Sequence, residues 1–414
     1  MPSDPVLDDL RKVCHDRARA AEEADAVADV AARYVASPDS TEEASEVLRL
    51  AAQHDLRVVA RGAGTKLGWG APPTAVDLVL DTSAITGVVE HAAGDLVAVV
   101  RAGTTVETLQ ATLAEAGQQL ALDVPDRSAT VGGTVATNIS GPRRLLYGTL
   151  RDLLIGITFV RADGVVAKAG GKVVKNVAGY DFGKLLTGCY GTLGVITQVA
   201  FRLHPHPPVQ RFLTIKVDGA EDVGRAVAAA IGSQVVPSAV DVHQPADGPT
   251  CVTVLLEGTE QGVLGRAETT SALLGDAAAS DQPPPWFGAL PFADDQVGLK
   301  LTTEIAGLPR LLLAVGQAAD RHGVGIEVNG SAAGVLYAGL SADVPPDAAA
   351  GVVADLRAAA GSYSGSVVVL TAPAAVRREL DMWGPVPGLD LMHRLKDQLD
   401  PQHRLAPGRF VGGI

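Results

Sequence analysis

The stretch from Gly170 to Thr197 reads GGKVVKNVAGYDFGKLLTGCYGTLGVIT. It contains seven glycines, three lysines, one acidic residue and no proline. Glycine tolerates positive φ and lets the backbone approach a ligand closely, so successive N–H groups can surround phosphate oxygens. The last residues lead from glycine directly into an apolar run of the kind that forms a strand. The stretch therefore indicates a loop-to-strand junction beside a bound anion.

Positive charge accumulates around this stretch in an otherwise acidic chain. The whole chain has 414 residues and a formal net charge of −13. A group of basic residues in a chain of negative net charge indicates an anionic partner or a charged surface. Because the cluster lies among glycines and apolar runs, we expect a buried or half-buried anion site. Its members are three acidic residues (152, 163 and 181) and nine Lys or Arg residues (127, 143, 144, 151, 161, 168, 172, 175 and 184).

Two further glycine-rich stretches support this expectation. RGAGTKLG (61–68) follows the strand-like LRVVA, and RSATVGGTVATNISG (127–141) combines the adjacent glycines 132 and 133 with short polar side chains. The first is not a P-loop, because no Ser or Thr follows Lys66. It is not a Rossmann fingerprint either, because its third glycine is one residue late and WGAPP follows instead of a helix. Each stretch alone is consistent with a tight turn, but together they favour a ligand that carries phosphate.

Composition sets wider limits. The length favours two domains. The acidic balance argues against nucleic acid as a partner. No run of about 18 apolar residues or apolar leader is present, so we expect no membrane span and a cytoplasmic location, with attachment to a membrane through partner subunits left open. The three cysteines (14, 189 and 251) are too scattered for a disulfide framework or an iron–sulfur cluster.

The pattern of elements is mixed α/β in the first half and α+β in the second. STEEASEVLRLAAQHD predicts a helix that Ser40 or Thr41 caps. After the proline-rich FRLHPHPPVQ (201–210), the best candidate for a linker, helices alternate with strands that can pair antiparallel. This order predicts a second domain of ferredoxin-like halves.

Four motifs resemble the FAD-binding domain of the vanillyl-alcohol oxidase / p-cresol methylhydroxylase superfamily: RGAGTK, ATVGGTVATNISGPRRLLYGTLRDLLIG, GGKVVKNVAGYD and YGTLGVIT. Within it they are most similar to the FAD-binding (E) subunits of bacterial glycolate oxidase. LKDQLDPQHRLAPGRF (395–410) resembles the closing segment of the family, with Ala406 in place of the usual Asn. The resemblance implies an α+β fold, in which a two-part FAD-binding domain precedes a ferredoxin-like cap. We expect a helical lead-in over 1–35, the FAD-binding domain over 36–206, and a cap over 207–414 whose C-terminal segment returns to the FAD-binding domain.

The same resemblance implies which residues hold FAD. The first stretch would surround the pyrophosphate, the second would flank the diphosphate, ribityl chain and flavin edge, and the third would meet the flavin or adenine with backbone groups. The basic cluster would then pair with the two phosphates. The residues carried over are Arg61, Gly62, Ala63, Gly64, Thr65, Lys66, Thr130, Val131, Gly132, Gly133, Thr134, Asn138, Ser140, Gly141, Gly191, Gly194, Val195 and Ile196.

Two departures from the family bear on the chemistry. None of the nine histidines lies in a glycine stretch, and Cys189 is not where a tether is expected, so we expect non-covalent FAD. The hydroxy-acid dehydrogenases of the superfamily carry a cap motif H-x-G-D-G-N-x-H for a metal. The corresponding EVNGSAAGVLYAG (327–339) has no histidine, so we predict no metal site and assign no catalytic base.

The resemblance implies oxidation of glycolate or a related 2-hydroxy acid to the 2-oxo acid by hydride transfer to flavin. Lys300 is the candidate cation for the substrate carboxylate, although a strand-edge lysine in solvent is the other interpretation. Arg143 and Arg144 could serve FAD, the substrate or a subunit contact. The family works with a second flavin subunit and an iron–sulfur subunit. Two alternatives remain: a non-catalytic or electron-relay flavoprotein that supports a catalytic sister subunit, and a stand-alone oxidoreductase.

Overall fold

The first sheet is small, mostly parallel, and ends at the first glycine stretch. The computed structural model describes residues 4–171, 179–275 and 277–414. The strand order is β1-β2-β4-β3, in which β2, β4 and β3 are parallel and β1 is antiparallel to β2. Two helices pack on this sheet. The elements are α1 (Pro5–Cys14), β1 (Ala18–Ala20), β2 (Tyr34–Ala36), α2 (Thr41–Gln53), β3 (Val58–Arg61) and β4 (Leu78–Asp81).

Local sequence explains the helices of this part. Ser40 caps α2, because its hydroxyl accepts a hydrogen bond from the Glu43 amide at 3.2 Å. Within residues 4–35 the helical lead-in is present as α1 and two short 3-10 helices, His15–Arg17 and Glu23–Asp25. Strand β1 interrupts it, and its Ala18 is buried with Tyr34 in the core beneath α1 and α2.

The second sheet is antiparallel and has the order β5-β6-β10-β8-β9. Helices α3 and α4 pack on it through a shared apolar core. A two-stranded pair, β7–β11, lies where the chain leaves for the cap. The elements are β5 (Val88–Ala92), β6 (Val97–Arg101), α3 (Val106–Ala114), β7 (Gln118–Gln119), α4 (Val131–Thr137), α5 (Arg144–Tyr147), α6 (Leu150–Leu153), β8 (Leu154–Val160), β9 (Val166–Gly170), α7 (Phe182–Leu186), β10 (Val195–Arg202) and β11 (His204–Pro205).

The cap is one eight-stranded antiparallel sheet, built from two ferredoxin-like halves. The strand order is β15-β12-β14-β13-β17-β18-β16-β19, and the halves join where β13 pairs with β17. The predicted β-α-β-β-α-β halves are therefore confirmed. Its elements are β12 (Val209–Val217), α8 (Ala220–Ile231), β13 (Ala239–Gln244), β14 (Thr250–Gly258), α9 (Glu260–Leu274), β15 (Ala278–Ser280), β16 (Gly298–Thr302), α10 (Leu308–His322), β17 (Ile326–Ser331), β18 (Val335–Leu340), α11 (Pro346–Gly361), β19 (Ser366–Thr371) and α12 (Ala374–Arg377).

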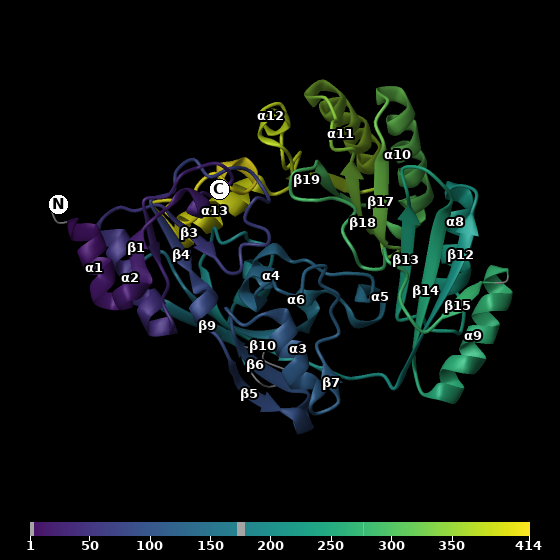
Figure 1. The fold of residues 1–414 in the computed structure, drawn as a ribbon, viewed down its shortest axis with the longest axis horizontal. Coiled ribbons are helices and arrows are strands. Elements are labelled where there is room, and N and C mark those ends of the chain that lie inside the picture. The colour runs from purple at the N-terminus through teal and green to yellow at the C-terminus, as the bar shows by residue number, and fades with distance from the viewer. Residues whose placement is uncertain (1–3, 172–178, 276) are drawn as a thin grey trace.

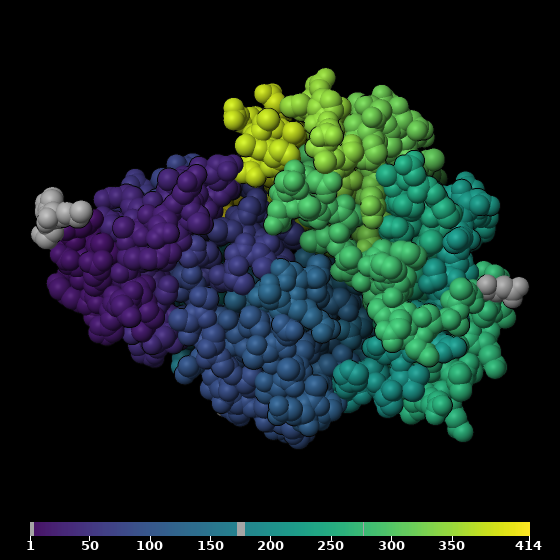
Figure 2. Space-filling view, in the orientation of Figure 1, coloured from purple at the N-terminus to yellow at the C-terminus, as the bar shows by residue number. Residues whose placement is uncertain are grey.

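The two faces of the cap sheet differ. Four helices, α8 to α11, cover one face and share its apolar core (Figure 1). The other face packs against the N-terminal part of the chain. The contact is a small cluster of aromatic and aliphatic side chains centred on Trp69, Ile139, Tyr337 and Leu370. In Figure 2 the N-terminal part, purple to blue, and the cap, teal to yellow, touch along a broad boundary.

The chain returns from the cap to the first part through α13 (Leu389–Leu399) and the residues after it (Figure 1). Lys396 anchors this return and has no exposed surface. Its Nζ donates hydrogen bonds to Thr192 O at 2.7 Å, Asp400 Oδ2 at 2.8 Å and Leu405 O at 2.8 Å. Leu405 forms a parallel bridge with Val58 of β3. The closing segment therefore adds to the first sheet beside the glycine stretches.

Two simpler findings concern the described residues. No helix among them is long and apolar enough to cross a membrane. All three cysteines are buried, and none forms a disulfide. Burial raises the pKa of Cys14 to about 12 and raises the pKa of Cys189 and Cys251 as well, which makes their thiolates scarce.

Candidate functional site: a cavity where three glycine stretches meet

The three glycine stretches converge on one cavity, although they are far apart in the sequence. The cavity has about 760 Å³ of space free of protein atoms, part of it open to solvent. It lies between the loop after β3, the start of α4 and the loop before β10. The carried-over residues that line it are Arg61, Gly62, Ala63, Gly64, Thr65, Lys66, Thr130, Gly132, Gly133, Gly191, Gly194, Val195 and Ile196.

The remaining carried-over residues do not reach this wall. Val131 and Thr134 are on the inner side of α4, where Val131 packs in the core and the Thr134 hydroxyl bonds to the backbone one turn earlier. Asn138 ends the helix in a left-handed conformation. Ser140 and Gly141 line a separate small cavity that faces the cap. Their expected contact with FAD is therefore not supported by the cavity.

Glycine is required in these stretches for close approach. A Cβ on Gly62 would collide with Thr130 Oγ1, so the first stretch can touch α4 only because residue 62 has no side chain. A Cβ on Gly132 would lie 2.7 Å from Ala102 Cβ. These contacts leave bare backbone along the wall, the kind of surface that a large polar ligand needs.

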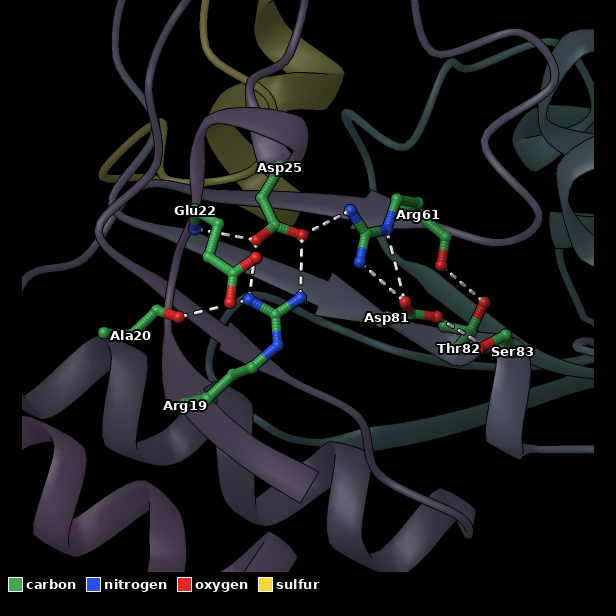
Figure 3. Close-up of polar contacts among 8 residues, drawn as sticks. All are labelled: Arg19, Ala20, Glu22, Asp25, Arg61, Asp81, Thr82 and Ser83. Carbon is green, nitrogen blue, oxygen red and sulfur yellow. Dashed lines mark hydrogen bonds and ion pairs between the residues drawn. The ribbon is translucent and has the colours of Figure 1, made fainter. Parts of the chain in front are cut away.

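Arg61 does not offer its charge to the cavity. Its guanidinium pairs with Asp25 at 2.9 Å and with Asp81 at 2.8 Å (Figure 3). Arg19 also binds Asp25 and, with Arg61, holds the pKa of that carboxyl far below its usual value. The Thr82 hydroxyl donates to the Arg61 carbonyl at 3.1 Å. Arg61 therefore lines the cavity but fixes the end of β3 with its guanidinium, because two carboxylates already neutralise that charge.

Two other cations line the cavity without an acidic partner among the described residues. Lys66 Nζ donates to Thr65 Oγ1 at 3.2 Å and lies 5.7 Å from the Trp69 ring centroid. Burial lowers its pKa, which the more distant Asp126 and Asp294 offset in part. An uncompensated, half-buried ammonium beside bare backbone is a site for an anion.

Arg409 is the second such cation, and the sequence had not marked it as a site residue. It is buried, and its Nη2 donates to Leu67 O at 2.7 Å and Trp69 O at 2.6 Å. Its Nε has no partner among the described residues. Burial lowers its pKa to about 10. Together with Lys66, this charge fits a ligand with phosphate groups, as FAD has.

The basic cluster of residues 127–184 does not surround the cavity. Its described members are seven, and none of them is in the lining. Arg143 binds Asp123 at 2.6 Å, Arg161 binds Asp163 at 3.0 Å, and Arg127 is exposed. The cavity therefore gives no support to their expected pairing with the phosphates. Lys172 and Lys175 lie outside the described residues.

Tyr190 is a second cavity residue that the sequence did not single out. It lies between the glycines of the third stretch with φ of 55° and packs edge-on against Trp383, with 5.2 Å between ring centroids. It also packs against Phe410, which follows Arg409. Burial raises its pKa, so it stays a neutral phenol. Other lining residues not carried over are Ala60, Leu67, Thr82, Ala136 and Thr137.

Lys300 is not a strand-edge lysine. Its strand, β16, pairs on both sides, with Tyr337 of β18 and Val368 of β19 opposite Lys300. Leu299 and Leu301 are fully buried, so the alternation of the strand directs Lys300 to the face away from the helices. The interpretation of Lys300 as a solvent lysine is therefore contradicted.

Arg144 and Tyr337 form the surroundings of Lys300. Two causes together lower the pKa of Lys300 to about 8: burial, which is the larger, and the positive charge of Arg144. Arg144 donates to the carbonyls of Ser140 and Gly141. Burial raises the pKa of Tyr337 while Arg144 opposes the rise. Tyr337 and Tyr190 belong to one apolar cluster, which connects Lys300 to the cavity wall.

The segment expected to lack a metal motif forms the β17–β18 hairpin. Asn329 donates from Nδ2 to the carbonyls of Trp286 and Ala289, which holds the loop before β16 on the sheet. The described part of the chain contains no group of three or more His, Cys, Asp or Glu side chains that could hold a metal ion. The described lining of the cavity also includes no histidine or cysteine.

Comparison with known proteins agrees with this site. Residues 32–170 match the family model of the FAD binding domain. The chain is 36% identical to D-lactate dehydrogenase of Archaeoglobus fulgidus over 207 residues, which are 50% of this chain and 46% of that protein. It is 38% identical to glycolate oxidase subunit GlcE of Escherichia coli over 152 residues, 36% of this chain and 43% of that protein. Glycolate oxidase subunit GlcD of Bacillus subtilis is 33% identical over 224 residues, 53% of this chain and 46% of that protein. The chain thus spans about half the length of these curated relatives.

Solved structures extend the likeness to the whole fold. p-Cresol methylhydroxylase with substrate bound superimposes with a TM-score of 0.77 at 16% identity, covering 98% of this chain and 96% of that one. An alkyldihydroxyacetonephosphate synthase gives a TM-score of 0.75 at 16% identity, covering 98% and 86%. The FAD binding domain match, the relatives and this fold agree with the cavity of glycines and unpaired cations. Residues 32–170 therefore match an FAD binding domain, and the chain shares the overall fold of p-cresol methylhydroxylase.

Proposed function

We propose that the cavity holds FAD without a covalent bond. The first stretch, from Gly62 to Lys66, would lie along the pyrophosphate with Lys66 as its counter-charge. Gly132 and Gly133 would face the ribityl chain, and Gly191 to Ile196 the flavin or adenine. The observation that supports this best is the pair of uncompensated cations, Lys66 and Arg409, beside bare backbone. The absence of histidine and cysteine from the described lining supports a non-covalent site.

We further propose that the chain oxidises glycolate or a related 2-hydroxy acid to the 2-oxo acid. FAD would supply the chemistry by accepting a hydride. This chain would bind and orient the acid between the cavity and the cap sheet. Lys300 and Arg144 place two positive charges there. Neither forms an ion pair within 4.0 Å among the described residues, and Asp123 only partly offsets the burial of Arg144, which suits a carboxylate. The relatives named for D-lactate and glycolate support the same substrate class.

A second candidate is a non-catalytic or electron-relay subunit that supports a catalytic sister flavin subunit. Two observations favour it: the β17–β18 hairpin has no histidine, and apolar side chains around Trp69 and Tyr337 fill the boundary between cavity and cap. The likeness to GlcD and GlcE supports a complex with a second flavin subunit. An iron–sulfur subunit would then receive the electrons. A location in the cytoplasm, or at a membrane through such partners, belongs to the same proposal. A stand-alone oxidoreductase is the third candidate.

One experiment separates these candidates. The purified chain is loaded with FAD, its visible spectrum is recorded, and glycolate or D-lactate is added without oxygen. Loss of the flavin absorbance when substrate is added to the purified chain alone supports a catalytic subunit or a stand-alone enzyme. Bleaching only after sister subunits are added supports the relay. Flavin that stays in the protein pellet after acid precipitation would refute the non-covalent site, and failure to take up FAD would refute the whole proposal.

A further inference from the structure

The two cations beside Tyr337 differ in a way that matters for chemistry. Arg144 is fixed, because its Nε and Nη2 donate to two backbone carbonyls of the preceding turn. A guanidinium also keeps its proton at any physiological pH. Arg144 is therefore a permanent, oriented cation, which also interacts with the hydroxyl of Tyr337.

Lys300 has the opposite properties. No hydrogen bond or ion pair within 4.0 Å joins its ammonium to any described residue. The groups that face it are Arg144 from α5, Tyr337 from β18 and the apolar Val368 from β19. None of these three groups stabilises the ammonium of Lys300, and the positive charge of Arg144 disfavours it. Lys300 is thus an amine without a hydrogen-bond partner among the described residues, and its pKa falls to about 8 through burial and the charge of Arg144.

A 2-hydroxy acid has two polar groups that need different partners. Its carboxylate needs a permanent cation, and its hydroxyl needs a base. We propose that Arg144 binds the carboxylate of the acid and that Lys300 accepts the proton of its hydroxyl group. This inference rests on the proposed function and assigns the base that the missing histidine motif left open.

The step balances as follows. The neutral Lys300 amine takes the proton from the hydroxyl oxygen and becomes an ammonium. The hydrogen on the α-carbon leaves with its electron pair to the bound FAD, which is reduced, and the carbon–oxygen single bond becomes the double bond of the 2-oxo acid. Tyr337, a neutral phenol next to both cations, can donate a hydrogen bond to the same oxygen-rich substrate.

The first test measures Lys300 without any reaction. The FAD-loaded protein is labelled with trace acetic anhydride at pH 6 to 10, and the Lys300 peptide is quantified by mass spectrometry. We expect a labelling midpoint near the pKa of about 8, and a higher midpoint in Arg144→Gln, because the neighbouring charge is removed. Lys216, exposed on β12 of the same sheet, is the internal control for the labelling of a solvent-facing lysine. A Lys300 midpoint equal to that of Lys216 would overturn the inference.

The second test separates binding from proton transfer. Oxalate, which has carboxylates but no hydrogen to lose, is titrated into the FAD-loaded protein, and anaerobic flavin reduction by glycolate and D-lactate is followed against pH. Wild-type reduction should rise about tenfold per pH unit below the Lys300 pKa and then level off. Arg144→Gln should weaken oxalate binding roughly 10- to 100-fold. Lys300→Arg should bind oxalate within about threefold of wild type but reduce its flavin roughly 10²- to 10⁴-fold more slowly. Lys216→Met should change neither.

The outcomes distinguish the inference from the proposed function. If wild type is not reduced by either acid, the proposed function is refuted, and the proton transfer with it. If wild type is reduced and Lys300→Arg is reduced equally fast, the proposed function stands and the inference alone is refuted, because Lys300 then acts only as a cation. Slow reduction in Lys300→Arg and in Lys300→Met, with oxalate binding kept in the former, supports the inference.

Discussion

Removing the buried amine of Lys396 tests how the closing segment is held. In Lys396→Met the Asp400 carboxylate loses its only buried counter-charge among the described residues, and the carbonyls of Thr192 and Leu405 each lose a donor. Breaking a fully buried ion pair in this way costs about 3–5 kcal/mol. Taking 2–4 °C per kcal/mol for a domain of 150–250 residues, the melting temperature should fall by roughly 6–20 °C.

The assay is thermal unfolding of the purified variant, followed by circular dichroism with and without FAD. Thr192 lies between the cavity glycines 191 and 194, so the stabilisation that FAD gives to wild type should shrink in the variant. Asp397→Asn is the matched control on the same helix. Its pair with His403 is exposed, and losing it should cost about 0–1 kcal/mol.

A companion variant isolates the buried charge. In Lys396→Met/Asp400→Asn the stranded carboxylate is gone, and an amide oxygen can still accept from the Leu405 amide, as Asp400 does at 2.7 Å. Part of the lost stability should return. The reasoning is refuted if Lys396→Met melts within the range of Asp397→Asn, or if the second substitution makes the loss larger.

Three further predictions follow from single contacts. Gly62→Ala forces a Cβ against Thr130, so it should lower the free energy of unfolding by about 1–3 kcal/mol and weaken FAD binding. Adding Thr130→Ala should restore part of the stability and part of the FAD binding. Urea unfolding measures the first and flavin fluorescence the second. Lys66→Met should raise the dissociation constant of FAD by roughly 10- to 150-fold, which corresponds to the loss of a charge-assisted hydrogen bond of about 1.5–3 kcal/mol. Arg127 belongs to the basic cluster but is exposed and outside the cavity, so Arg127→Met should leave the dissociation constant unchanged. Burial, and to a lesser extent the charge of Asp123, raises the pKa of Asp241 well above 3.8. The folded chain therefore keeps a proton that the unfolded chain releases. The free energy of unfolding then falls by up to about 1.4 kcal/mol per pH unit as the pH rises toward the pKa of the folded state. Asp241→Asn should therefore gain stability over wild type between pH 4 and neutrality, and an equal urea midpoint for the two at pH 7 would contradict this.

The elements of the cap could be predicted closely from sequence. Helices α8 and α10 have a clear apolar face, and the order of the elements after residue 208 indicates two ferredoxin-like halves, which the strand order bears out. Buried apolar stripes decide these elements, and such stripes are visible in a single sequence. The N-terminal segment was harder, because short strands such as β1 gain their stability from burial under α1 and α2 and not from local propensity.

The site was predicted in part, for a related reason. Glycine marks where the backbone must approach something, so the three stretches were found and do meet at one cavity. Charge is a poorer guide, because sequence does not show which cations are already paired. Arg61 and Arg143 are neutralised by acids distant in sequence, whereas Arg409 is not. Tyr190 carried a weak signal, as a large residue between glycines of a binding loop.

The cavity is assembled from the first and the last parts of this sequence, which has a consequence for synthesis. Asp25 binds Arg61 at the start of the first glycine loop, and Arg409 binds the carbonyls of Leu67 and Trp69 at its end. A ribosome delivers Arg409 only after the whole cap has been made, and domains otherwise tend to fold as they emerge. The wall of the cavity therefore stays incomplete until the residues after α13 have been made and have docked. Flavin uptake would then act as a late checkpoint, available only to chains translated through residue 409.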